Sequence, residues 1–181
     1  AVFDAADAVM LSAETAAGSY PVEAVTLMNK IIMETESHDL YRRYLDAARL
    51  EPEHTPESAI TVSARVTAET LEDAAAIVSY TISGATAGRV SRERPYIPVM
   101  CMTPDESVAR KMSLFWGIES VVCEPMNLLV DVARRASGYC RDLFGAKVGE
   151  KIIMTAGLPF NVTGNTNLLH IFSVTNQKSE K

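Results

Sequence analysis

The sequence predicts a three-layer α/β domain with a mostly parallel sheet of about five strands. Short apolar runs alternate with helical segments through the second half of the chain, and this alternation specifies a parallel sheet with helices on both faces. The expected strands are residues 75–80, 97–102, 118–122, 151–155 and 168–174. The loop between the last two is too short for a crossover helix, so the last strand is expected to be antiparallel.

A different pattern precedes this domain. The apolar run at residues 8–11 predicts a short strand. Pro21 then opens a helix, as proline does in a first turn, and apolar residues recur at helical spacing to about residue 48, with a break near His38. One strand and one helix cannot bury their own faces. We therefore expect this segment to be the last strand and helix of a larger sheet or barrel.

The domain organisation follows from these patterns. Residues 1–50 form the barrel remnant and a linker helix, residues 51–56 are a polar linker with two prolines, and residues 57–181 form the second domain. The sequence begins without methionine in the middle of a pattern, which predicts that it is a piece of a longer chain.

Composition narrows the class of protein. The net charge is −6 and no basic face dominates, which argues against a nucleic-acid partner, and no apolar run is long enough to span a membrane. Cys101, Cys123 and Cys140 are widely spaced, which predicts reduced thiols in a cytoplasmic protein. The three histidines lack metal-ligand spacing, so no metal site is expected.

The first candidate site follows the strand at residues 75–80. Its small-residue loop contains Thr81, Ser83, Gly84 and Thr86, and a helix begins at about residue 87. Backbone N–H groups, hydroxyl groups and the helix dipole together form an anion site, and glycine lets the backbone approach the anion closely. The alternative is an ordinary turn in which Ser83 or Thr86 caps the helix.

The second candidate loop, residues 157–167, follows the fourth strand. Ligands of open α/β sheets bind beyond the carboxyl ends of the strands. If the first and fourth strands are near neighbours, both loops close over one ligand. Arg89 and Arg92, on the helix after the first loop, are candidates for additional positive charge.

Three stretches resemble the pyruvate kinase family. Residues 9–21, VMLSAETAAGSYP, are similar to the segment that ends its (β/α)₈ barrel. Residues 81–87, TISGATA, with the later Arg94-Pro95, resemble the effector-phosphate loop of its C-terminal domain. Residues 157–159 and 164–167 resemble its later effector loop.

The resemblance implies an activity for the parent protein. Enzymes of this family move a phosphoryl group from phosphoenolpyruvate to ADP with Mg²⁺ and commonly K⁺, in the cytoplasm. Ser12 and Glu14 would then belong to the catalytic polar network at the end of the eighth barrel strand. The alternative for this pair is an N-cap and a first-turn acid. Because the other barrel strands are absent, we expect this chain alone to be inactive and to bind neither cation.

The resemblance also implies an allosteric role for the second domain. A phosphorylated sugar or nucleotide would bind there and bias a homotetramer towards its active state. The expected phosphate-binding residues come from both loops: Thr81, Ser83, Gly84, Ala85, Thr86, Gly164, Asn165 and Thr166. Ala85 departs from family members that have a hydroxyl or larger side chain at this position. The alternative functions are a stand-alone phosphometabolite-binding module and an oligomerisation module.

Overall fold

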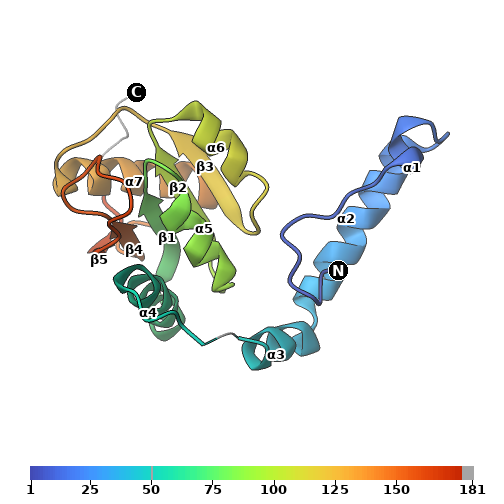
Figure 1. The fold of residues 1–181 in the computed structure, drawn as a ribbon, viewed down its shortest axis with the longest axis horizontal. Coiled ribbons are helices and arrows are strands. Elements are labelled where there is room, and N and C mark those ends of the chain that lie inside the picture. The colour runs from blue at the N-terminus through green and yellow to red at the C-terminus, as the bar shows by residue number, and fades with distance from the viewer. Residues whose placement is uncertain (50, 177–181) are drawn as a thin grey trace. The chain divides into compact units, whose positions relative to one another are not determined.

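The computed structural model describes residues 1–49 and 51–176 (Figure 1). The chain divides into two compact units, the first ending at Glu51 and the second beginning at Pro52. Residues 177–181 of the expected second domain lie outside the described part of the chain.

The second unit is built on a five-stranded sheet with the strand order β3-β2-β1-β4-β5. The strands are β1 (Ala74–Tyr80), β2 (Val99–Thr103), β3 (Ile118–Val122), β4 (Lys151–Ala156) and β5 (Leu168–Ser173). The first four are mutually parallel, and β5 pairs with β4 in the antiparallel direction. The predicted sheet and the direction of its last strand are confirmed. β2 begins two residues later than expected because Pro98 has no N–H to donate to the ladder.

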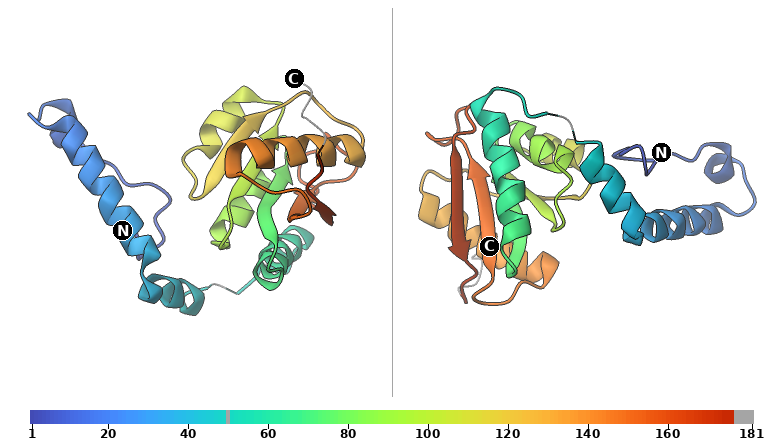
Figure 2. Two further views of the ribbon diagram at one scale, coloured as in Figure 1. Left: turned by 180° about the vertical axis from the view of Figure 1, so that it is seen from behind. Right: turned by 90° about the horizontal axis from the view of Figure 1, so that it is seen from below.

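Helices cover both faces of this sheet. They are α4 (Pro56–Thr70), α5 (Ala85–Arg92), α6 (Glu106–Met112) and α7 (Leu129–Phe144). Side chains of α7 form one core with alternate residues of β1, β2 and β4, whereas side chains of α4, α5 and α6 pack on the opposite face. Figure 2 shows α7 lying across one face of the sheet. The predicted three-layer arrangement is confirmed.

The three cysteines lie in this second unit. All are free and buried, and burial raises the pKa of Cys101 and Cys140 to about 12 and that of Cys123 to about 11. A raised pKa means that the neutral thiols stabilise the fold below the ordinary thiol pKa of about 8.5. This contribution is lost as the pH rises towards the folded-state values.

We predict that the native chain resists thiol reagents. The thiolate is the reactive form, and at pH 8 a thiol with a pKa near 12 has a thiolate fraction about a thousandfold below that of an ordinary cysteine. A chromogenic disulfide reagent at pH 8 should label the urea-unfolded chain rapidly and the native chain slowly. Rapid stoichiometric labelling of native protein would show that these sites are open.

Helices form the first unit. They are α1 (Ala13–Ala16), α2 (Pro21–Ser37) and α3 (Asp39–Ala47). The predicted break is confirmed: His38 has an extended backbone between α2 and α3, and its Nδ1 accepts the N–H of Leu40 at 3.2 Å. The predicted strand at residues 8–11 is wrong, because this segment forms no strand. A strand needs a neighbour to pair with its backbone, and the described residues of this unit provide none.

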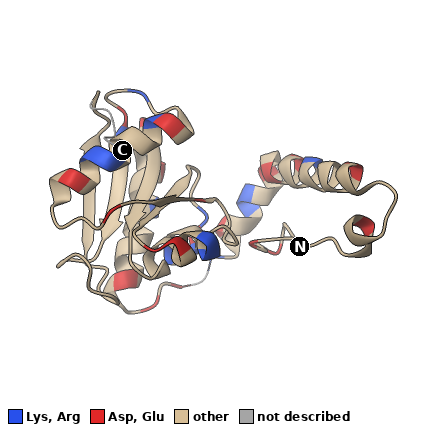
Figure 3. Cartoon of the chain, turned by 90° about the horizontal axis from the view of Figure 1, so that it is seen from above, with Lys and Arg blue, Asp and Glu red and all other residues tan. Residues whose placement is uncertain are grey.

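Charged residues of both signs are interspersed over the helices and loops (Figure 3). In the part of the chain that the structure describes, no helix is long and apolar enough to span a membrane.

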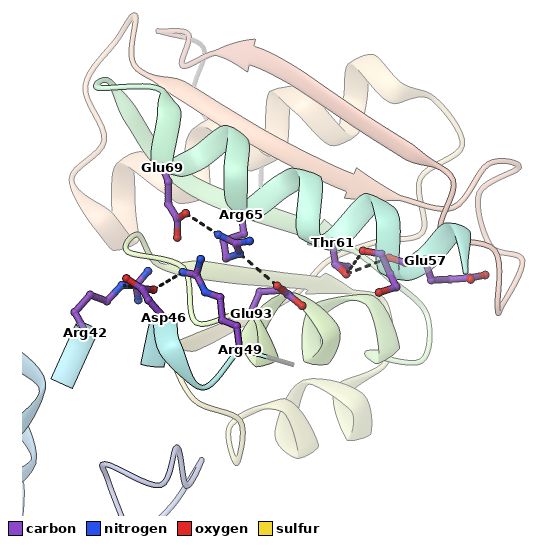
Figure 4. Close-up of polar contacts among 9 residues, drawn as sticks. Arg42, Asp46, Arg49, Glu57, Thr61, Arg65, Glu69 and Glu93 are labelled. Atoms are coloured by element: carbon purple, nitrogen blue, oxygen red, sulfur yellow. Dashed lines mark hydrogen bonds and ion pairs between the residues drawn. The ribbon is translucent and has the colours of Figure 1, made fainter. Parts of the chain in front are cut away.

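One buried ion-pair network joins α4 to the end of α5 (Figure 4). Arg65, on α4, donates from Nη1 to Glu69 Oε2 at 2.7 Å and from Nε to Glu93 Oε2 at 3.3 Å. Glu93 is the C-cap residue that directly follows α5. The network therefore ties the helix that follows the first candidate loop to its neighbour α4.

Candidate functional site

The loop after β1 is stabilised by its own side chains. Thr81 Oγ1 accepts the N–H of Gly84 at 3.1 Å, and Ser83 Oγ accepts the N–H of Ala85 at 3.4 Å. Gly84 is the N-cap of α5 and has φ +79°, in the left-handed region that favours glycine. An added Cβ there would lie 2.9 Å from the Met112 side chain. Helix α5 thus begins at Ala85, two residues earlier than the sequence predicted.

This geometry bears on the alternative in which Ser83 or Thr86 caps helix α5. The capping position belongs to Gly84, which has no side chain, and Thr86 lies inside the first turn. Ser83 bonds the first N–H group of the helix only at the long distance given above. N–H groups in the first helical turn have no partner within the helix, so this end of α5 retains donors that face the loop region.

The two candidate loops meet at one edge of the sheet. β1 and β4 are adjacent and parallel, and their last residues, Tyr80 and Ala156, are paired in the register. The loops after these residues therefore leave the sheet side by side. Thr86 Oγ1 and Thr166 Oγ1 are hydrogen-bonded at 2.6 Å, and both side chains are buried.

A small cavity of about 30 Å³ lies between the loops, and we call it the inner cavity. Seven of the eight predicted phosphate-binding residues line it: Thr81, Ser83, Ala85, Thr86, Gly164, Asn165 and Thr166. Gly84 does not line it. Arg89 contributes a cationic side chain to its wall, and no Asp or Glu is among its described lining residues.

The inner cavity has the chemistry of an anion site. The Thr81 and Ser83 hydroxyl oxygens accept hydrogen bonds from the backbone, so each hydroxyl retains its proton for donation to a ligand. The Thr86–Thr166 pair uses one proton for its mutual bond and retains another. Together with the positive end of α5 and the Arg89 guanidinium, these donors favour a compact negatively charged group.

Asparagine side chains order the second loop from within. Asn165 Nδ2 donates to the carbonyl oxygen of Leu158 at 2.6 Å, and Asn167 Nδ2 donates to the same oxygen at 2.8 Å. Asn167 Oδ1 accepts the N–H of Leu158 at 2.8 Å. The Asn165 amide, predicted to contact phosphate, is thus also used to close the loop on itself.

Tyr80 lines the inner cavity, although no sequence motif predicted it as a site residue. Its buried hydroxyl accepts the N–H of Met126 at 2.9 Å and lies 3.3 Å from Asn161 Oδ1. Its ring makes an edge contact with Phe160, with the ring centroids 5.4 Å apart. Burial raises the pKa of Tyr80. Tyr80 therefore fixes the second loop to the sheet. The sequence feature that indicates this role is its position as the last residue of a predicted strand.

The predicted catalytic pair lies in the first unit. Ser12 is the N-cap of α1, and its N–H donates to Glu14 Oε2 at 3.0 Å. Hydrogen bonds from the backbone N–H groups of Glu14 and Ser12 lower the pKa of Glu14. Both side chains are exposed. Ser12 occupies the N-cap position without a side-chain capping hydrogen bond, and Glu14 lies in the first turn, so the geometry fits the helix-start alternative in part. A catalytic role for the pair stays a prediction.

The described residues, 1–49 and 51–176, contain no cluster of three or more His, Cys, Asp and Glu side chains that could hold a metal ion.

The chain matches a known protein family. The family described as "Pyruvate kinase, alpha/beta domain" matches residues 58–172. The chain is 40% identical over 174 residues to a pyruvate kinase of Agrobacterium vitis, covering 96% of this chain and 36% of that protein. It is 40% identical over 182 residues to a pyruvate kinase of Methylorubrum extorquens, covering 100% of this chain and 38% of the relative.

A solved structure supports the same family assignment. The crystal structure of a pyruvate kinase from Cryptosporidium parvum superposes with a TM-score of 0.81 at 28% identity, covering 96% of this chain and 34% of that one. The chain thus spans little more than a third of the length of these curated relatives. It belongs to the pyruvate kinase family and contains that family's C-terminal α/β domain.

Proposed function

We propose that the second unit is the effector-binding domain of a pyruvate kinase and that its inner cavity binds the phosphate group of a phosphorylated sugar or nucleotide. The observation that carries the proposal is the convergence of two loops, whose residues Thr86 and Thr166 are 80 positions apart in sequence, on a cavity that has hydroxyl donors, a helix N-terminus and Arg89 but no carboxylate in its described lining. Such a cavity selects a compact anion.

The parent enzyme would transfer a phosphoryl group from phosphoenolpyruvate to ADP in the cytoplasm, with Mg²⁺ and K⁺ bound by its barrel. Effector binding would bias a homotetramer towards the active state, with a coupling free energy of about 1–3 kcal/mol. This chain alone would have no pyruvate kinase activity and would hold neither cation. Pyruvate formation by the purified chain would contradict that part of the proposal.

A thermal melt of the chain tests the binding proposal. The ligands are glucose 6-phosphate, ribose 5-phosphate, fructose 1,6-bisphosphate, AMP and inorganic phosphate. A ligand that binds only the folded state stabilises it by about 2.7 kcal/mol at a hundredfold excess over its dissociation constant, which raises the melting temperature by roughly 5–11 °C. We expect at least one phosphorylated compound to give this rise.

Two pairs of substitutions test whether this rise in melting temperature depends on the first loop. Ser83→Ala combined with Thr86→Ala should abolish the rise, measured from the variant's own baseline because Thr166 loses its hydrogen-bond partner. Ser113→Ala combined with Thr70→Ala is the matched control, since both hydroxyls bond only to carbonyl groups of their own helical turns. A rise that survives the first pair of substitutions would remove the loop from the site. No rise with any compound would favour an oligomerisation module.

A further inference from the structure

We infer that Tyr80, Asn127 and Asn161 form a latch that couples anion binding in the inner cavity to the segment between β3 and α7. We call this segment, residues 123–128, the connecting segment. The inference rests on the proposed phosphate site, because the anion is what closes the latch. Coupling between two sites is reciprocal, so the connecting segment in turn controls how tightly the cavity holds its anion.

The connecting segment reaches the site by crossing the end of β2. It leaves β3, which is two strands away from β1 in the sheet. The N–H of Cys123 donates to the carbonyl oxygen of Thr103, the last residue of β2, at 3.0 Å. The N–H of Met126 then donates to the Tyr80 hydroxyl, at the end of β1, at 2.9 Å. Met126 and Tyr80 are both buried, and Tyr80 lines the inner cavity.

Asn161 joins the second loop to the connecting segment. Its Nδ2 donates to Asn127 Oδ1 at 2.8 Å and to the carbonyl oxygen of Met126 at 3.4 Å, and its Oδ1 accepts the Tyr80 hydroxyl at 3.3 Å. Its backbone has φ +64°, in the left-handed region that asparagine tolerates better than most residues. Asn161 lines the inner cavity, whereas Asn127 is not among its described lining residues. One side chain therefore connects the cavity wall to the connecting segment.

An anion in the inner cavity closes the latch through the second loop. The latch holds this loop near its middle, and the bond between Thr86 and Thr166 holds it near its end. Residues 162–164 lie between these attachments, are exposed and line the cavity. An anion that bridges the two loops holds this span in place, and so keeps Asn161 against Asn127. Ordering the loop therefore makes local opening of the connecting segment less favourable.

Hydrogen exchange of the Met126 amide in the whole ¹⁵N-labelled chain tests the coupling. This amide must leave the Tyr80 hydroxyl before it exchanges. Saturating inorganic phosphate should slow its exchange about fivefold, as one further hydrogen bond that must break predicts. In Asn127→Ala the slowing should fall to about twofold or less, and phosphate affinity from chemical-shift titration should fall roughly two- to fivefold. A purely structural role would speed exchange without removing its dependence on phosphate.

Asn29→Ala is the control, because Asn29 is an exposed asparagine of the first unit whose side-chain amide contacts Met33 on its own helix. It should keep the full slowing by phosphate. Two outcomes would overturn the latch and leave the phosphate site standing. In the first, residues 81–89 shift saturably with phosphate while Met126 exchange stays unchanged; in the second, Asn127→Ala keeps the full slowing. No saturable shift at any residue would overturn the latch and the phosphate site together.

Discussion

Gly157→Ala is expected to weaken binding of a phosphate compound at least tenfold while the sheet remains folded. A Cβ at this position would lie 2.1 Å from the backbone oxygen of Asn165, so the backbone must move. The displaced residues include Asn165 and Thr166, which line the inner cavity. Loss of even one hydrogen bond to a charged phosphate costs about 1.5–3 kcal/mol, which corresponds to tenfold or more.

The measurement is a calorimetric titration with the compound that gives the largest rise in the thermal melt. Gly117→Ala is the matched control: its new Cβ meets no atom within 4 Å, although φ +65° makes the substitution strained. That variant should lose about 1–2 kcal/mol of stability and keep its affinity. Unchanged binding by Gly157→Ala would show that the second loop is not part of the site.

Arg65→Ala is expected to lower the free energy of unfolding of the second unit by about 3 kcal/mol, because it removes the guanidinium group that bridges two largely buried carboxylates. The Arg65 side chain is 10% exposed, and those of Glu69 and Glu93 are 20% and 15% exposed. Urea unfolding followed by fluorescence measures the change. Trp116 is the sole tryptophan of the sequence and lies in this unit.

Arg110→Ala provides the comparison. Arg110 also pairs with a glutamate four residues away, Glu106, but these side chains are 71% and 69% exposed. Exposed pairs contribute about 0.2–1 kcal/mol, so this variant should remain close to the unsubstituted chain. If the two arginine variants differ by less than 1 kcal/mol, the buried network does not hold α4 and α5 together.

The sheet was largely predictable from the sequence, whereas the meeting of the two loops was predictable only on a condition. Residues 151–155 and 168–174 are apolar runs joined by a loop without a crossover helix, which leaves an antiparallel pairing as the simple solution. The glycine and hydroxyl residues of the first loop indicate an anion site by their chemistry alone. The adjacency of β1 and β4 was stated only as a condition, because strand order depends on long-range pairing.

Other features depend on contacts that one sequence does not reveal. Residues 8–11 have the composition of a strand, but composition cannot supply the neighbouring strand that such a segment must pair with. In the sequence, Gly157 looks like an ordinary turn glycine. Only the close approach of the Asn165 backbone in the fold explains why a residue without a Cβ is needed there. The hydrogen bonds of Tyr80 join three segments far apart in the chain.

Backbone amide NMR of the ¹⁵N-labelled chain, titrated with inorganic phosphate, tests the central claim most directly. If phosphate binds between the two loops, the amide signals of residues 81–89 and 157–167 should shift together along one saturable curve. Signals from α7 and from the first unit should stay in place. Saturable shifts confined to other parts of the chain, or no saturable shift at any residue, would contradict the claim that this edge of the sheet is a phosphate site.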